Sequence, residues 1–373
     1  MLKNKKFILS IKVILICLIL FVFATGIGLI FLARSPKSAA LFADNVLRPL
    51  IGNSATISLE GIVFNTQDSI NHLFKHQPNP TSYITNVKIV KAVPSYSPPP
   101  NILPSVDTGN ELSGEGVWEK IAGSDLFTTH IRTDPERLYS VVNLVYIPIK
   151  NISIAAVAGT KYPGGTLGKP GLGMIPVNVQ KSGNLLAAFN GGFQERDGHY
   201  GMYSDGVTYV PLRMGLGTLF IYKNGKVGLS LYDGKPLAPD VLTARQNGPF
   251  LVENNITSKI TSEGIDLWAG TASGGYVTWR SGIGITKDGD LIYAVGPSLT
   301  PTSLADALRL AGSQNAMQLD VNDFWVRFMV YSWNSKNKSY SYSPLIKGLA
   351  DGGSQFLHGY EKDFFYLYKN TSQ

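Results

Sequence analysis

The longest hydrophobic segment of the chain lies near the N-terminus. The rest of the chain alternates between short apolar runs and polar residues, with frequent glycines. Val13–Ala33 carries no charged side chain, and a run of this length can cross a bilayer as a helix. Lysines cluster before it, which predicts a cytoplasmic N-terminus and a main domain outside the cytoplasm. A cleaved signal peptide is the alternative, but its apolar core is usually shorter. We therefore expect residues 1–34 to form a cytoplasmic tip and a single-pass membrane anchor, with the lipid bilayer as its partner.

Two further segments separate the anchor from the main domain. Residues 35–91 contain short amphipathic patterns and are predicted to form a juxtamembrane helical segment. His72 and His76 lie four residues apart and can share a helix face as a metal pair, but no acidic residue between them can act as a base. A solvated helix face is the favoured interpretation. Residues 92–104 are rich in proline and predict an extended, semi-rigid linker.

From residue 105 onward, short β-branched and aromatic runs alternate with glycines. The pattern predicts strands at Val141–Ile149 and Ile152–Gly159, and hairpins over Gly217–Tyr232 and Tyr276–Val295 with Asn-Gly and Asp-Gly turns. The fold class predicted for residues 105–373 is α+β: a single strand-rich domain with few helices, preceded by one N-terminal transmembrane helix.

The end of the domain carries the clearest helix pattern. Thr302 or Ser303 can cap a helix that continues to Leu310, and Gly312 can end it. The polar stretch Ser332–Pro344 is expected to be a loop, and Lys362–Lys369 is expected to be a closing strand.

Charge and cysteine content exclude several functions. The net charge is +7, but six basic residues precede the first acidic one, which leaves 27 basic against 26 acidic residues, a balance of +1. No basic patch remains to bind a phosphate backbone, so no nucleic-acid partner is expected. The single cysteine, Cys17, lies in the anchor, which excludes disulfides and a thiol nucleophile from the domain. No two histidines of the domain are close in sequence, so no metal site and no cofactor are predicted.

Polar residues stand at the ends of several predicted strands. An apolar strand stops at Asn190, and Gly191 and Gly192 follow. These glycines allow backbone N–H groups to approach a ligand or to form an anion-binding nest, and a plain turn is the alternative. Arg245, with Asn247, precedes an apolar segment, and Arg280 alternates with apolar neighbours. A guanidinium can bind a phosphate through two parallel hydrogen bonds, or it can form a salt bridge with a nearby acid.

One carboxylate interrupts an apolar stretch. Asp320 follows the predicted strand Ala316–Leu319 and precedes an aromatic run. A buried, unpaired carboxylate is costly unless its pKa shifts. We therefore expect Asp320 to face a cleft shared with Arg280 and Asn190, where a guanidinium lowers its pKa. The alternative is an aspartate that caps a turn through backbone hydrogen bonds.

Five segments in order resemble the phosphodiester glycosidase family: AAFNGGF, ARQNGPFLV, RSGIGITKDGDLIYAVG, SLADALRLAGSQNAMQLD and KDFFYL. The resemblance covers roughly Gly116 to Tyr368. The family includes the uncovering enzyme that removes N-acetylglucosamine from phosphate on lysosomal glycans, and membrane-anchored bacterial proteins. One departure is clear, because the family usually has Leu-Asp-Gly-Gly where this chain has Leu319-Asp320-Val321-Asn322. A bacterial branch of anchored relatives shares the Asp-x-Asn form.

The resemblance implies a membrane-anchored extracytoplasmic hydrolase that cleaves a sugar-1-phosphodiester in a cell-surface glycan. It implies two catalytic residues, Asp320 and Arg280. The substrate-binding residues that it implies are Asn190, Gly191, Gly192, Arg245, Asn247 and Asn322. The expected partner is then a glycan or sugar phosphate. The alternative function is a non-catalytic glycan-binding or envelope-assembly module that uses the same cleft.

Overall fold

The structure, a computed structural model, describes residues 42–75, 77–90, 99–104, 106, 112–261 and 277–370. The predicted anchor and His76 lie outside these ranges. Within them, no helix combines the length and the apolar character that crossing a membrane requires. The chain divides into two compact units, Met1–Thr56 and Ile57–Gln373. In the first unit, the π-helix η1 (Ala43–Leu47) leads into α3 (Arg48–Ile51), and α4 (Asn53–Phe74) begins there and continues into the second unit.

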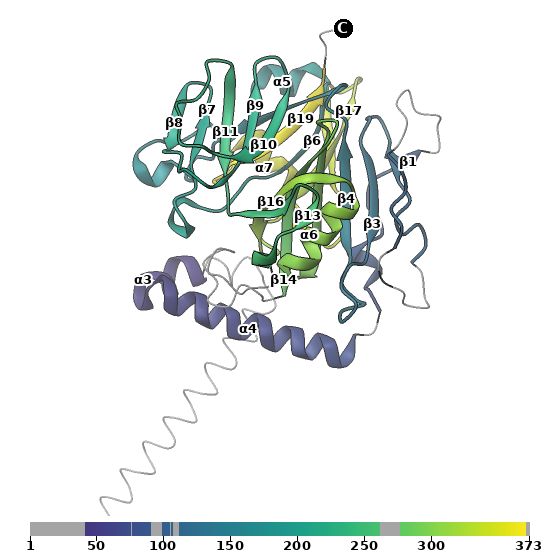
Figure 1. Ribbon diagram of the computed structural model, residues 1–373. Helices are drawn as coiled ribbons and strands as arrows, with labels where there is room; N and C mark the ends of the chain where they lie inside the picture. The colour runs from purple at the N-terminus through teal and green to yellow at the C-terminus, as the bar shows by residue number, and fades with distance from the viewer. Residues whose placement is uncertain are drawn as a thin grey trace, which may run out of the picture. The chain divides into compact units, whose positions relative to one another are not determined.

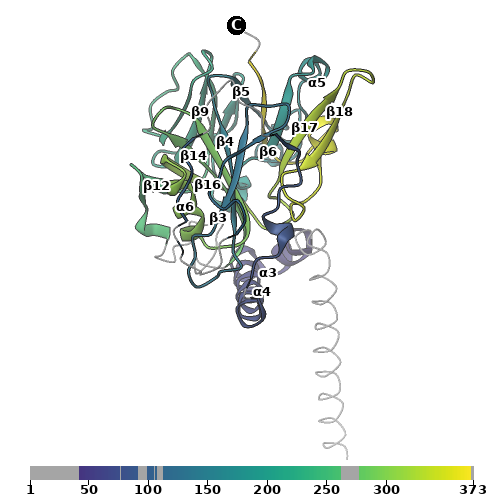
Figure 2. The same cartoon turned by 90° about the vertical axis from the view of Figure 1, so that its right-hand side faces the viewer.

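Three antiparallel sheets make up the second unit (Figures 1 and 2). The nine-stranded sheet contains, in spatial order, β1 (Ile89–Val90), β2 (Glu119–Ile121), β3 (Phe127–Ile131), β4 (Val142–Ile147), β15 (Leu291–Leu299), β14 (Thr278–Thr286), β16 (Ser313–Val321), β12 (Phe250–Glu253) and β13 (Ile256–Thr257). Its first strand, β1, precedes residue 105, where the sequence places the start of the domain.

The other two sheets have five strands each. The β6 sheet contains β18 (Ser339–Pro344), β17 (Phe328–Asn334), β6 (Leu185–Asn190), β19 (Phe364–Lys369) and β5 (Ile152–Val157). The β9 sheet contains β10 (Val227–Leu231), β9 (Gly217–Tyr222), β11 (Val241–Gln246), β7 (Met202–Ser204) and β8 (Val207–Val210). Short helices connect the strands: η2 (Pro80–Ser82), η3 (Gly165–Leu167), α5 (Val177–Ser182), η4 (Glu195–Asp197), η5 (Lys259–Thr261) and α7 (Gly353–His358).

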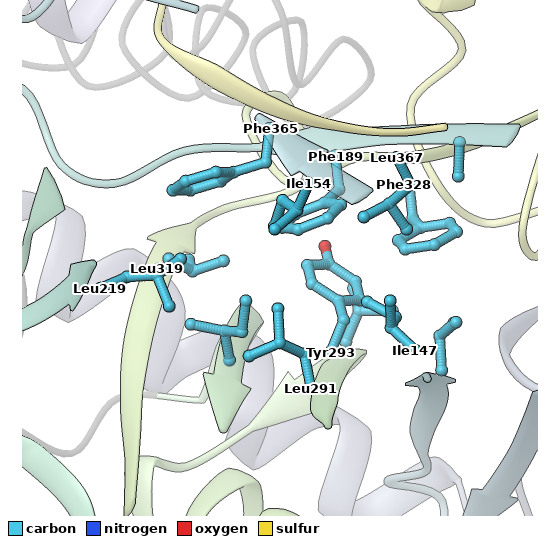
Figure 3. Close-up of a cluster of buried hydrophobic side chains, with 14 of the residues drawn as sticks. Ile147, Ile154, Phe189, Leu219, Leu291, Tyr293, Leu319, Phe328, Phe365 and Leu367 are labelled. Carbon is cyan, nitrogen blue, oxygen red and sulfur yellow. The ribbon is translucent and has the colours of Figure 1, made fainter. Parts of the chain in front are cut away.

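The main core lies between the nine-stranded sheet and the β6 sheet, with Leu219 of the β9 sheet at its side (Figure 3). Tyr293 of β15 contacts Phe189 of β6 with ring centroids 4.9 Å apart, and Phe189 stacks on Phe328 of β17 at 5.6 Å. The odd-numbered residues Leu291, Tyr293 and Val295 all point into this core. The two sheets are therefore joined mainly by apolar and aromatic packing.

The opposite face of the nine-stranded sheet is covered by α6 (Pro301–Leu310). Ile292 and Ala294 of β15 face the helix, which explains why β15 reads as a continuous apolar run rather than an alternating one. The helix begins earlier than predicted, because Thr300 is its N-cap and accepts a hydrogen bond from the backbone N–H of Ser303. Its predicted end at Leu310 is confirmed.

The strand-rich character with few helices is confirmed, as are both predicted hairpins. β9 pairs with β10 across Asn224-Gly225, and β14 pairs with β15 across Asp288-Gly289. Gly225 and Gly289 have φ angles of 80° and 87°, the left-handed conformation that glycine adopts without a steric penalty.

The polar loop predicted at Ser332–Pro344 is wrong, because β17 and β18 form a hairpin there. Serine and tyrosine alternate along β18, so the tyrosines share one face. Tyr340 packs against Trp333 at 4.7 Å between ring centroids, and Tyr342 lies 6.0 Å from Tyr331. Cross-strand aromatic pairs of this kind stabilise a hairpin even when every second residue is polar.

Candidate functional site

Polar side chains from four strands and three loops, contributed by all three sheets, gather in one group. We call this group the polar end; it consists of Asn190, Arg245, Asn247, Arg280, Ser281, Asp320, Arg327, Lys362 and Asp363. β6, β11 and β16 end here, and β14 and β19 begin here, because neighbouring strands run antiparallel. The side-chain amide of Asn190 donates to Ser281 Oγ at 2.9 Å and thereby links the β6 sheet to the nine-stranded sheet.

Asp320 occupies the end of β16 and is only 3% exposed. Its carboxylate forms an ion pair with the ammonium group of Lys362 and accepts a hydrogen bond from the backbone N–H of Val321 at 3.0 Å. Ser281 fixes its backbone, since Ser281 Oγ donates to the carbonyl of Asp320 at 3.0 Å and accepts from its N–H at 3.1 Å. Burial raises the pKa of Asp320 from 3.8 to about 6, and Lys362 offsets only part of this effect.

The expectation that a guanidinium lowers the pKa of Asp320 is wrong. The cation paired with Asp320 is Lys362, and desolvation outweighs it, so the pKa rises. Arg280 is fully buried and donates from Nε to the carbonyl of Leu299 at 2.9 Å and from Nη1 to Gln318 Oε1 at 2.7 Å. Its register partner on β16 is Val321, next to Asp320. Arg280 therefore lies one strand from the carboxylate, with two of its nitrogens bonded to protein oxygens.

Arg245 forms the second buried ion pair of the polar end. Its Nε and Nη2 donate to the two oxygens of Asp363 at 2.7 and 3.0 Å, which is the bidentate geometry of a strong pair. Nη2 also donates to the carbonyl of Phe193 at 2.8 Å, and Nη1 to that of Gln246 at 2.7 Å. Every nitrogen of this guanidinium bonds to a protein oxygen, which is typical of an architectural residue.

The two glycines after β6 make room for Asp363. A Cβ atom on Gly191 would lie 2.0 Å from Asp363 Oδ2, and the backbone N–H of Gly192 donates to that oxygen at 3.3 Å. A Cβ atom on Gly192 would lie 2.9 Å from Asn247 Oδ1. The close approach that glycine was expected to allow is therefore made by a carboxylate of the protein itself.

The three asparagines hold backbone segments together. Asn190 Oδ1 accepts from Tyr293 Oη at 2.9 Å and from the N–H of Arg327 at 3.0 Å. Asn247 donates to the carbonyl of Leu319 at 2.7 Å. Asn322 has φ 66°, and its Oδ1 accepts from two backbone N–H groups at 3.1 Å each. Asparagine tolerates this left-handed conformation, so Asn322 replaces the second glycine of the family pattern without strain.

Two cations at the polar end were not predicted from the sequence: Lys362 and Arg327. Lys362 Nζ lies 4.5 Å from the ring centroid of Trp325, and the Arg327 guanidinium lies 5.1 Å from that of Tyr360. The segment before β17 and the segment before β19 thus exchange two cation–π contacts. One signal was available, because a lysine and an aspartate directly precede the apolar run of β19.

Arg327 has no carboxylate partner among the described residues. It is 2% exposed, and it donates to the carbonyl of Phe324 at 3.0 Å and to Gln355 Oε1. Its Nε is buried without a hydrogen-bond partner in the described part of the chain. A buried guanidinium with an unused donor is costly, which favours a bound anion at this position.

The charge balance of the polar end also favours a bound anion. Its buried side chains comprise four cations and two carboxylates. Asp197, half-buried in η4, lies near enough to raise the pKa of Asp320 and adds a third negative charge. Within the polar end the buried cations outnumber the buried carboxylates, which favours an anion as ligand next to a carboxyl group whose pKa is raised to about 6.

Comparisons with known proteins find a family match over part of the chain. Residues 183–320 match the family model of the phosphodiester glycosidase, so the resemblance inferred from the sequence is confirmed for this segment. The segment begins two residues before β6 and ends at Asp320. The match supports a glycosidase-type function. No curated protein matches the chain.

Three solved structures show limited similarity. The catalytic domain of zebrafish N-acetylglucosamine-1-phosphodiester α-N-acetylglucosaminidase, auto-inhibited by its pro-peptide, is 14% identical, with a TM-score of 0.44 over 67% of this chain and 86% of that chain. A hypothetical protein from Synechocystis is 11% identical, with a TM-score of 0.34 over 68% and 64%. An exported protein from Burkholderia pseudomallei is 11% identical, with a TM-score of 0.31 over 61% and 74%.

No group of three or more histidine, cysteine, aspartate or glutamate side chains that could hold a metal ion occurs in the described ranges. The pairing of His72 with His76 lies partly outside them.

Proposed function

We propose that the protein is a membrane-anchored extracytoplasmic hydrolase that cleaves a sugar-1-phosphodiester in a cell-surface glycan. The observation that carries the proposal is the family match over residues 183–320, because this segment supplies Asn190, Arg245, Arg280 and Asp320 to the polar end. Membrane anchoring rests on the uncharged run Val13–Ala33.

Asp320 is the catalytic carboxylate in this proposal. The bond between the anomeric carbon and the bridging phosphate oxygen breaks, and its electron pair leaves with the phosphate. Positive charge then develops on the sugar, and an ionised carboxylate beside the anomeric carbon stabilises it. Water supplies the hydroxyl group of the product sugar, and its remaining proton passes to the phosphate product or to solvent. The phosphate leaving group is a weak base, so protonation by a general acid contributes less than in ordinary glycoside hydrolysis.

Lys362 and Arg327 are the residues that we assign to the phosphate, in place of Arg245. All nitrogens of Arg245 already bond to protein oxygens, whereas Lys362 has three N–H donors and Arg327 has an unused Nε donor. A phosphodiester carries one negative charge and its cleavage product carries up to two. The negative charge on the leaving phosphate already grows in the transition state, so these two cations stabilise the transition state more than the substrate, which is the requirement for catalysis.

The test is Asp320→Asn in the full chain, assayed with a panel of sugar-1-phosphodiesters for the release of reducing sugar. The substitution keeps the shape and removes the charge, so we expect turnover to fall at least about a thousand-fold, with a melting temperature within a few degrees of wild type. Asp323→Asn is the matched control, because it removes a neighbouring, partly buried carboxylate outside the ion pair, and it should retain most turnover. Full activity of Asp320→Asn would contradict the assignment.

The second candidate function is a non-catalytic glycan-binding or envelope-assembly module. The observation that favours it is the sequence Val321-Asn322 where the family usually has two glycines. In the same experiment, retention of the wild-type protein on a glycan column, without release of sugar from any phosphodiester, would select this alternative.

A further inference from the structure

The second unit exposes an apolar helix face. On α4, the side chains of Leu59, Ile62, Val63, Ile70, Leu73 and Phe74 are all exposed, from 45% at Leu59 to 78% at Phe74. These positions recur at intervals of three, four and seven residues, so they form one stripe along the helix. We call them the α4 stripe. A surface helix normally turns such a stripe toward the core.

The face of α4 that contacts the domain is mainly small and polar instead, with the half-buried Phe64 among its residues. Gly61 and Asn71 are buried, and Asp68 is half-buried. The Asp68 carboxylate accepts hydrogen bonds from Arg137 Nη2 at 2.9 Å and from Tyr139 Oη at 2.8 Å. At 100° per residue, these positions lie on the side of the helix away from the α4 stripe. The orientation is therefore fixed by specific polar contacts that hold the apolar side chains outward.

The chain itself indicates what covers this face. The uncharged run Val13–Ala33 is predicted to cross a bilayer, and only 25 residues, 34–58, separate it from Leu59. Even when fully extended they span at most about 90 Å, so α4 stays close to any membrane that holds the run. Tethering of this kind makes a weak second contact effectively intramolecular.

Resting on the membrane anchoring of the proposed function, we propose that the α4 stripe lies in the interfacial layer of the same bilayer that holds the N-terminal anchor. Asn53–Phe74 contains no lysine or arginine. The contact therefore depends on apolar burial and not on anionic headgroups, and phosphatidylcholine alone is a sufficient partner. Because Asp68 joins α4 to the segment between β3 and β4, the contact also fixes the orientation of the domain on the membrane.

The experiment uses the full chain with its single cysteine removed (Cys17→Ala), reconstituted into phosphatidylcholine vesicles. Ile62→Cys or Ile70→Cys is labelled with an environment-sensitive fluorophore. Asn65→Cys is the matched control, because Asn65 is an exposed residue of the same helix outside the α4 stripe. An interfacial helix buries its apolar face by about 5–10 Å. We therefore expect brominated lipids to quench the labels at 62 and 70 several-fold more than the label at 65, and 1 M salt to leave the difference unchanged.

Three results would overturn the proposal. One is equal quenching, or none, at the three positions. A second is failure of the protein to float with the vesicles. The third is self-quenching between labels at position 70 without lipid quenching, which would show that a second copy of the chain covers the face.

Discussion

Lys362 and Asp363 are adjacent, both about 2% exposed, yet they belong to ion pairs of opposite character. Asp363 accepts two parallel hydrogen bonds from Arg245 and a third from the backbone N–H of Gly192. Arg245 also donates to two backbone carbonyls. Lys362 forms an ion pair with Asp320, whose carboxylate also accepts a hydrogen bond from the backbone N–H of Val321. Every guanidinium nitrogen of the Arg245–Asp363 pair donates a hydrogen bond, whereas the Lys362–Asp320 pair has fewer hydrogen bonds among the described residues.

The difference indicates that the Arg245–Asp363 pair has a structural role, whereas the Lys362–Asp320 pair has the properties expected of a reactive site. A saturated guanidinium offers nothing to a ligand, but it holds the ends of β6, β11 and β19 together. The Lys362–Asp320 pair is left with a carboxyl pKa of about 6 and a compact ammonium with spare donors. Perturbed ionisation of this kind is common at functional sites. In the proposed function, the reaction is therefore assigned to Asp320, and Arg245 is assigned to the scaffold.

The largest expected effect separates the two pairs by stability. Arg245→Met removes the partner of a buried carboxylate, and we expect the free energy of unfolding at neutral pH to fall by about 3–5 kcal/mol. Lys362→Met should cost less, because Asp320, whose pKa is already raised, can escape the penalty by taking up a proton. Urea denaturation of both variants measures the difference. Equal losses would contradict the distinction between the pairs.

The next effect concerns pH. The pKa of Asp320 is higher in the folded protein than in the unfolded chain. The folded state therefore binds more protons between about pH 4 and pH 6, and the free energy of unfolding decreases as the pH rises through this window. The difference between a pKa of 3.8 and one of about 6 corresponds to about 3 kcal/mol of stability. Asp320→Asn lacks this loss. The stability of wild type relative to Asp320→Asn should therefore decline by about that amount from pH 4 to pH 7 in denaturant titrations, and parallel curves would refute it.

The smallest effect tests the unpaired cation. Arg327→Gln removes a charged donor, and we expect kcat/KM for a sugar-1-phosphodiester to fall about 10- to 100-fold, since a hydrogen bond to a charged group contributes about 1.5–3 kcal/mol. Inorganic phosphate should raise the melting temperature of wild type and not that of Arg327→Gln, which tests binding without turnover. Arg309→Gln on α6 is the control. Phosphate stabilisation that survives in Arg327→Gln would remove Arg327 from the site.

The sequence predicts hairpins and helix ends better than it predicts which side chains pair across the fold. Periodicity predicted both glycine-turn hairpins and the end of α6, because each depends on neighbouring residues. The position of Asp320 at a strand end also followed from its apolar surroundings. Its cation did not, because Lys362 is 42 residues further along the chain. The direction of the pKa shift then depended on the competition between burial and that unseen partner.

The expected roles of Arg245 and the glycines show the same limit. An arginine at a strand end looks alike whether it faces a ligand or a carboxylate 118 residues away. Only the three-dimensional structure shows that Asp363 occupies the place expected for a bound anion. The serine–tyrosine alternation of β18 is a local signal for a strand, because its period of two places the tyrosines on one face although half of the residues are polar.

The position of β19 constrains how the chain acquires its structure. This strand lies between β5 and β6 and pairs with both. It begins 174 positions after β6 ends, since 364 − 190 = 174. Ribosomes synthesise about 5–20 residues per second, so β5 and β6 lack the strand between them for roughly 9–35 s. During that interval the apolar edges of both strands are open to pairing with other chains. Completion of the sheet, and with it the delivery of Lys362 to Asp320, is therefore a late event in folding.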